Sequence, residues 1–177
     1  MAVSDALYGR QTGRHTPAWM YSLIWTPQEF EEYTVFTFVR NPWDRLHSAY
    51  RFLRKGGVNE WDRRFFDANL AQFSDFNDFV HKWVNPRNVW GFVHFYPQWY
   101  FVYEPCGRKL VDYVGRYESI DSDFRHVAES IGRPSARLTP RNVTGPRMSY
   151  QETYDHESRR IVEQVYRRDI EIFGYAF

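Results

Sequence analysis

The sequence predicts an α/β layer fold with a parallel sheet, because short buried strands alternate with amphipathic helices along the chain. The two predicted strands span residues 34–39 (TVFTFV) and 110–117 (LVDYVGRY), and both are rich in β-branched and aromatic residues. After each of them, apolar residues recur at spacings of three and four, which is the pattern of one helical face. At 177 residues, the chain is predicted to form a single domain over residues 1–177.

Four helices are predicted, each with one apolar face and recognisable end signals. The start signals are Asn41-Pro42, Ser74 and the capping box Ser149-x-x-Glu152, and the stop signals are Gly56-Gly57, Gly132 and Gly174. The inward-facing residues are predicted to be Trp43, Leu46, Tyr50 and Leu53; Phe76, Phe79, Val80 and Trp83; Phe124, Val127, Ala128 and Ile131; and Ile161, Val162, Val165 and Ile172.

The composition excludes several classes of protein. One residue in five is aromatic, which is too much ring surface for a disordered chain. The single Cys106 excludes an internal disulfide and a zinc thiolate cluster, and a net charge of +1 is not typical of a nucleic-acid-binding protein. No apolar run approaches the ~20 residues of a membrane span, and the start MAVSDALYGR lacks the regions of a signal peptide, so we expect a cytoplasmic protein.

The segment that carries chemistry is residues 36–53, FTFVRNPWDRLHSAYRFL. A strand brings Arg40 to its carboxyl edge and a helix starts immediately, which is where open parallel sheets bind ligands and where a helix start favours an anion. Ser48 lies two turns into that helix, on the flank that also carries Arg45 and Phe52. The residues alone leave a second interpretation open, in which Arg40 and Asp44 form a surface ion pair and Ser48 is a small packing residue.

The motif RNPWDRLHSAY resembles the donor-binding signature of the carbohydrate-type sulfotransferases (family 2), which use 3′-phosphoadenosine 5′-phosphosulfate (PAPS). GRHTPA, VGRYESI and RRDIEIFGYAF are also similar to that family, so the likeness covers roughly residues 10–177. The resemblance implies a three-layer α/β/α, P-loop NTPase-like fold with a central parallel sheet. It implies an enzyme that transfers the sulfuryl group of PAPS to a hydroxyl of a carbohydrate or other small acceptor, without a metal.

The resemblance also implies roles for particular residues. Arg40 and Ser48, eight positions apart, would bind the 3′-phosphate of the donor, and Asn41 and Arg45 match the same signature. Asn142 and Thr144 sit where the family often closes over the donor. The predicted donor-binding residues are therefore Arg40, Asn41, Arg45, Ser48, Asn142 and Thr144.

The resemblance suggests His15, 25 residues before Arg40, as the catalytic base. Imidazole suits that role because its ordinary pKa lies near 6.5, and the alternative is a structural histidine. His94 is the second candidate for the base. His94 and Gln98, with the rings around them, are predicted to line the acceptor site. Equally, the spacing of Phe92, Phe95 and Trp99 is consistent with core residues.

One part of the family pattern is missing from this sequence. The family cradles the 5′-phosphosulfate with an amino-terminal strand and loop that carries a Lys or Arg, but no Lys precedes Arg40 and residues 9–14 follow no apolar strand. We therefore expect an amino-terminally truncated sulfotransferase. The alternative is a catalytically inactive relic or regulatory module that binds PAPS or its product, adenosine 3′,5′-bisphosphate (PAP). A kinase-like domain is disfavoured because G-x-x-x-x-G-K-[ST] is absent.

Overall fold

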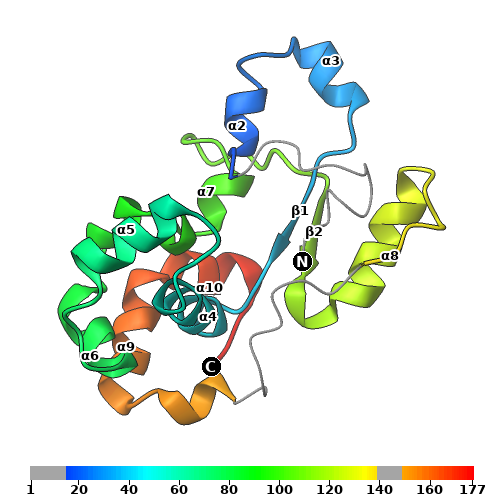
Figure 1. The fold of residues 1–177 in the computed structure, drawn as a ribbon. Coiled ribbons are helices and arrows are strands. Elements are labelled where there is room, and N and C mark those ends of the chain that lie inside the picture. The colour runs from blue at the N-terminus through cyan, green and yellow to red at the C-terminus, as the bar shows by residue number, and fades with distance from the viewer. Residues whose placement is uncertain (1–14, 139–148) are drawn as a thin grey trace. The chain divides into compact units, whose positions relative to one another are not determined.

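The computed structural model describes residues 15–138 and 149–177 (Figure 1). These residues divide into two compact units: the first comprises residues 15–40 and 98–138, and the second comprises residues 41–97 and 149–177. The chain passes from one unit to the other at the Arg40–Asn41 and Pro97–Gln98 peptide bonds. Asn142 and Thr144 lie outside the described residues.

The first unit contains a two-stranded parallel sheet. β1 (Phe36–Val39) pairs with β2 (Tyr113–Arg116), with Phe36 opposite Tyr113 and Val39 opposite Arg116. The mixed α/β class and the parallel pairing predicted from the sequence are confirmed. Both strands are shorter than predicted. At their amino ends the Asp112 carboxylate accepts the Val35 N–H at 2.8 Å, and after Arg116 the chain enters a 3-10 turn.

Short helices and one longer helix complete the first unit. They are α2 (Ala18–Tyr21), α3 (Pro27–Glu32), α7 (Trp99–Val102), the 3-10 turn η3 (Tyr117–Ser119) and α8 (Ile120–Ser130). As predicted, α8 has an apolar face, and its Phe124 and Val127 belong to a cluster that includes Phe36 and Phe38 of β1. The helix ends next to Gly132, whose φ of 71° is a conformation that favours glycine. One face of the small sheet is thereby packed against α8.

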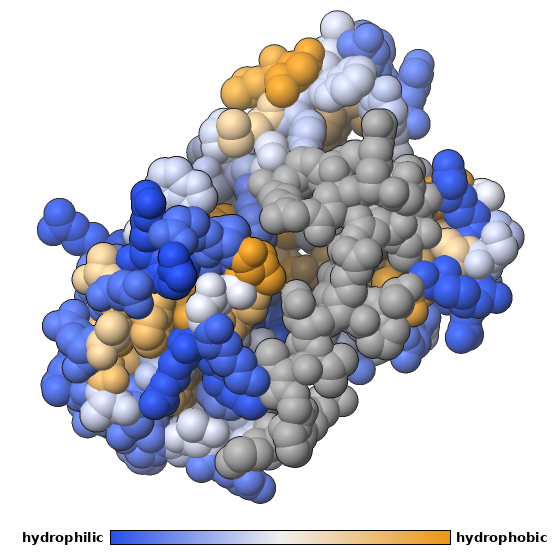
Figure 2. Space-filling model, viewed as in Figure 1, coloured by the Kyte–Doolittle hydropathy of each residue, from blue (hydrophilic) through white to orange (hydrophobic). Residues whose placement is uncertain are grey.

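The segment between α2 and α3 exposes apolar side chains. Leu23 and Ile24 are 77% and 75% exposed, and Figure 2 shows hydrophobic surface gathered at this end of the first unit. Glu29 on α3 completes a capping box with Thr26, which explains why this helix forms without burying any residue. The segment therefore adds little to the core of its unit.

The second unit is helical and has an aromatic core. Its elements are α4 (Pro42–Arg54), α5 (Glu60–Asn69), α6 (Phe76–Trp83), η1 (Asn88–Gly91), η2 (Val93–Phe95), η4 (Tyr150–Thr153), α9 (His156–Val165) and α10 (Arg167–Phe173). The predicted inward faces of α4 and α6 are confirmed, since all eight of their apolar residues are buried. The rings of Tyr50 and Phe79 stack at 4.9 Å, and Phe95 joins the same cluster. The core interpretation of Phe95 is therefore confirmed.

Two predicted helix starts in the second unit are wrong. Asp75, not Ser74, caps α6, because the Asp75 side chain accepts the Asp78 N–H at 2.9 Å. Ser149 starts only a 3-10 turn without a side-chain cap, and α9 begins later with Asp155 as its cap. The chain is extended at Tyr154 between them, where the Tyr154 hydroxyl donates to the Trp43 carbonyl at 2.9 Å.

The predicted last helix is also two helices rather than one. α9 ends at Val165 and α10 begins at Arg167, so the helical phase changes at Tyr166. Ile172 is consequently 36% exposed instead of inward-facing. Gly174 does end α10, with a φ of 63°, as predicted. Sequence reasoning missed α5, although the Asn59 cap and the acidic first turn were signals for it.

Candidate functional site

In the first unit, Arg40 lies directly after the carboxyl end of β1. The register pairs Val39 with Arg116, so Arg40 and Tyr117 are the next residues of two paired parallel strands. The guanidinium carbon of Arg40 lies 4.3 Å from the centroid of the Tyr117 ring. This cation–π contact restricts the plane of the guanidinium. Arg40 is only partly buried, so a guanidinium held in this way can bind two oxygens of an anion.

Gln98 holds the backbone of Arg40 at both of its polar groups. Its Oε1 accepts the Arg40 N–H at 2.8 Å, and its Nε2 donates to the Arg40 carbonyl oxygen at 2.8 Å. Gln98 is 6% exposed. The structure thus brings together Gln98, which was predicted to line the site of the acceptor substrate, and Arg40, which was predicted to bind the sulfate donor. In the structure, the Gln98 amide makes hydrogen bonds to the backbone of Arg40.

In the second unit, Asn41 caps α4. Its Oδ1 accepts the Trp43 N–H at 3.1 Å, and its Nδ2 donates to the Ala176 carbonyl at 2.7 Å. Pro42 has no N–H, and that of Trp43 is already bonded, so the first turn offers an anion fewer N–H groups than the sequence predicted. The helix dipole remains as an electrostatic contribution. Asn41 is buried and makes structural hydrogen bonds.

The flank of α4 that carries Arg45, Ser48 and Phe52 lies along η2. Arg45 Nη1 donates to the Tyr96 carbonyl at 2.8 Å, just after η2, and the Phe52 ring packs edge-on against the His94 ring at 5.2 Å. Arg45 and Ser48 are partly buried. The structure therefore places three residues predicted for donor or acceptor binding, namely Arg45, Ser48 and His94, around one flank of a helix.

His94 is paired with a buried carboxylate that sequence reasoning missed. Its Nε2 lies 3.2 Å from Asp62 Oδ1, and the other oxygen of Asp62 accepts the Val58 N–H at 3.0 Å. Burial lowers the pKa of His94, and the bond to Asp62 opposes that shift only in part. Asp62 is 3% exposed. Asp62 and His94 are 32 positions apart in sequence, so no local sequence signal indicated this pair.

His15 is exposed and lies near the start of the described chain. Its φ is 57°, which makes it the one non-glycine residue with positive φ among residues 15–138 and 149–177. Histidine adopts this left-handed conformation more often than most residues, and such outliers concentrate at functional positions. The backbone of His15 is therefore compatible with a functional role, and its predicted role as the base stays a prediction.

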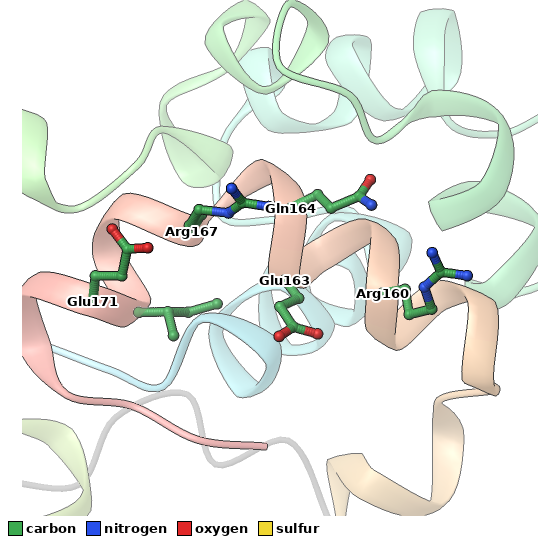
Figure 3. A pocket seen from close by; sticks show the side chains of 6 residues that line it. Arg160, Glu163, Gln164, Arg167 and Glu171 are labelled. Carbon is green, nitrogen blue, oxygen red and sulfur yellow. The ribbon is translucent and has the colours of Figure 1, made fainter.

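Two surface hollows on the described part of the chain are lined by residues other than the predicted site residues. One, of ≈ 460 Å³, lies on α9 and α10 and is lined by Arg160, Glu163, Gln164, Arg167, Ile170 and Glu171. Figure 3 shows that these side chains point in different directions and do not converge on one point. No trio of His, Cys, Asp or Glu within the described part of the chain is arranged to hold a metal ion. None of its helices is long and apolar enough to cross a membrane.

Tyr117 is the other site residue that sequence reasoning missed. The sequence did contain a signal for it, because each predicted strand is followed by a pair of polar residues, Arg40-Asn41 after the first and Glu118-Ser119 after the second. Carboxyl ends of neighbouring parallel strands share one edge, so pairing the two strands would have placed Tyr117 beside Arg40. A parallel strand pair that ends in an arginine held over a neighbouring ring, followed in sequence by a capped helix, is an α/β arrangement that is suited to binding an anion.

Comparison with known proteins specifies the family. The model of the sulfotransferase family matches residues 14–176 of the 177, so the chain belongs to the sulfotransferase family, as a family 2 member. The resemblance found in the RNPWDRLHSAY motif is thereby confirmed. The family is one of transferases that generally use PAPS as donor.

The individual relatives found by comparison have low sequence identity to this chain. Carbohydrate sulfotransferase 11 of Mus musculus is 25% identical over 179 residues, and carbohydrate sulfotransferase 14 of Danio rerio is 27% identical over 167 residues. These matches cover 88% and 81% of this chain but only 51% and 44% of the relatives, so the chain spans about half the length of the relatives it matches. An uncharacterized protein of Archaeoglobus fulgidus is 29% identical over 67% of this chain and 83% of its own. No solved structure matches.

Proposed function

We propose that the protein is a PAPS-dependent sulfotransferase that transfers the sulfuryl group to a hydroxyl of a carbohydrate or other small acceptor. The observation that carries the proposal is the position of Arg40 within the RNPWDRLHSAY motif, directly after β1 and directly before the cap of α4. The names of the two carbohydrate sulfotransferases among its relatives support a carbohydrate acceptor. The proposal includes the three-layer, P-loop NTPase-like fold, in which the parallel pair β1 and β2 would belong to the central sheet.

In this proposal, Arg40 and Ser48 bind the 3′-phosphate of the donor. Arg40 contributes a charge-assisted, two-pronged contact, and the Ser48 hydroxyl donates one further hydrogen bond. Arg45 adds positive charge from the same flank of α4. His15 takes the proton of the acceptor hydroxyl, and His94, kept neutral by burial, is the second candidate for that role.

Titration calorimetry with adenosine 3′,5′-bisphosphate (PAP) and adenosine 5′-monophosphate (AMP) tests the donor assignment. A charge-assisted hydrogen bond contributes about 1.5–3 kcal/mol, so Arg40→Ala should weaken PAP binding tenfold or more and leave AMP binding nearly unchanged. Ser48→Ala should weaken PAP binding about two- to tenfold, as loss of an ordinary hydrogen bond does. Arg87→Ala, at an exposed turn position, is the matched control and should bind both nucleotides like wild type.

Thermal melting and sulfate transfer complete the test. At a hundred times its dissociation constant, PAP should stabilise the fold by about 2.7 kcal/mol, which corresponds to roughly 5–10 °C for a chain of this size. Radiolabelled PAPS should then label a hydroxyl-bearing glycan acceptor. Binding without transfer would support the alternative of a nucleotide-binding module. Equal affinity for PAP and AMP in wild type would refute the 3′-phosphate site.

A further inference from the structure

We infer that Gln98 is a positioning residue that sets the 3′-phosphate selectivity of the donor site by holding the backbone of Arg40. The inference rests on the proposed function, because it gives Arg40 the task of binding the 3′-phosphate. It differs from the acceptor-binding role predicted from the sequence. It concerns only the first unit, in which Arg40, Gln98 and Tyr117 all lie.

The geometry shows why Arg40 needs this support. The β1–β2 ladder ends at the pair Val39–Arg116, so the backbone groups of Arg40 lie one residue past the last paired position. The Gln98 amide satisfies both of these groups at 2.8 Å, as a neighbouring strand would. A buried side-chain amide is suited to this task, because its NH₂ group can donate to the C=O and its oxygen can accept from the N–H of a single residue.

The consequence for binding follows from preorganisation. With its N–H and C=O fixed by Gln98 and its guanidinium placed over Tyr117, Arg40 is restrained at both ends of its side chain. A ligand then meets a guanidinium that loses little further freedom on binding. Without Gln98, the Arg40 guanidinium keeps its charge but the Arg40 backbone loses its fixed direction, and a displaced contact group weakens recognition. The loss should fall on the 3′-phosphate alone.

The experiment compares the affinities for PAP and AMP of wild type, Gln98→Met and Gln98→Glu. The methionine variant has similar volume and removes both bonds, whereas the glutamate variant keeps the acceptor for the Arg40 N–H and removes the donor to its carbonyl. We expect the PAP-to-AMP selectivity of Gln98→Met to fall about tenfold, with AMP affinity unchanged. Gln28→Met, at an exposed position of α3, is the control and should keep wild-type selectivity.

A double-mutant cycle separates positioning from general stability. Gln98→Met should change selectivity little further when Arg40→Ala is already present, because the two residues act through one contact. A purely structural role would instead weaken both nucleotides together and add to the effect of Arg40→Ala. If Gln98→Met does not fold, as judged by circular dichroism, Gln98→Glu decides the matter. A folded variant with wild-type selectivity overturns the inference alone, and wild type without selectivity overturns the proposed function as well.

Discussion

Asn41→Ala should reveal how strongly the start of α4 is tied to the end of the chain. The Asn41 side chain makes two bonds in the second unit, a cap to the Trp43 N–H at 3.1 Å and a donation to the Ala176 carbonyl at 2.7 Å. Loss of a helix cap costs about 1 kcal/mol, and loss of the second hydrogen bond costs about another 1 kcal/mol. The free energy of unfolding should therefore fall by about 2 kcal/mol, or roughly 4–8 °C in melting temperature.

Two further variants show how much of this loss of unfolding free energy comes from the cap and how much from the bond to Ala176. Asn41→Ser keeps a good capping oxygen but cannot reach Ala176, so it should lose only about 1 kcal/mol. Asn59→Ala removes a residue that caps α5 through the Asp62 N–H at 2.9 Å, and it should also lose about 1 kcal/mol.

Equilibrium urea unfolding, followed by tryptophan fluorescence and circular dichroism, measures all three variants. The expected order of destabilisation places Asn41→Ala first and the other two together. If Asn41→Ala destabilises the chain no more than Asn59→Ala, the bond to Ala176 contributes nothing and the reasoning is wrong.

The remaining predictions concern His15, His94 and Tyr166. His15→Gly removes the Cβ penalty at a φ of 57°, so stability to urea should be kept or rise by up to about 1 kcal/mol, while sulfate transfer should fall about 10²–10⁴-fold if His15 is the base. Retained transfer would exclude that role. Burial lowers the pKa of His94 from 6.5, so its contribution to stability is present above pH 6.5 and is lost as pH falls through the folded pKa. His94→Gln should flatten this acid decline in urea titrations at stepped pH, and an unchanged slope would contradict it. Burial raises the pKa of Tyr166 from 10.0, so its contribution is complete below pH 10 and falls above it by up to about 1.4 kcal/mol per pH unit. Tyr166→Phe should reduce that alkaline slope and cost about 1 kcal/mol at neutral pH, because the Phe95 carbonyl loses its donor at 2.7 Å. A neutral effect at both pH values would count against it.

The elements predicted best were those with strong local signals. The Asn41-Pro42 start and the buried face of α4 were readable because capping chemistry and helical periodicity act over a few residues. The start of α9 was not readable, because Tyr154 is held extended by a hydrogen bond to Trp43, 111 positions away in sequence. A local capping box at Ser149 could not compete with that distant contact.

By itself, the sequence determined the family, the mixed α/β class and the position of Arg40 between a strand and a helix. These follow from short-range patterns, in which the identity and spacing of neighbours decide the outcome. Only the tertiary structure decided that Gln98 holds the Arg40 backbone, 58 positions away in sequence, and that Asp62 pairs with His94. Such partners depend on which segments fold against one another, and a glutamine or an aspartate carries no mark in the sequence of the group it will bind.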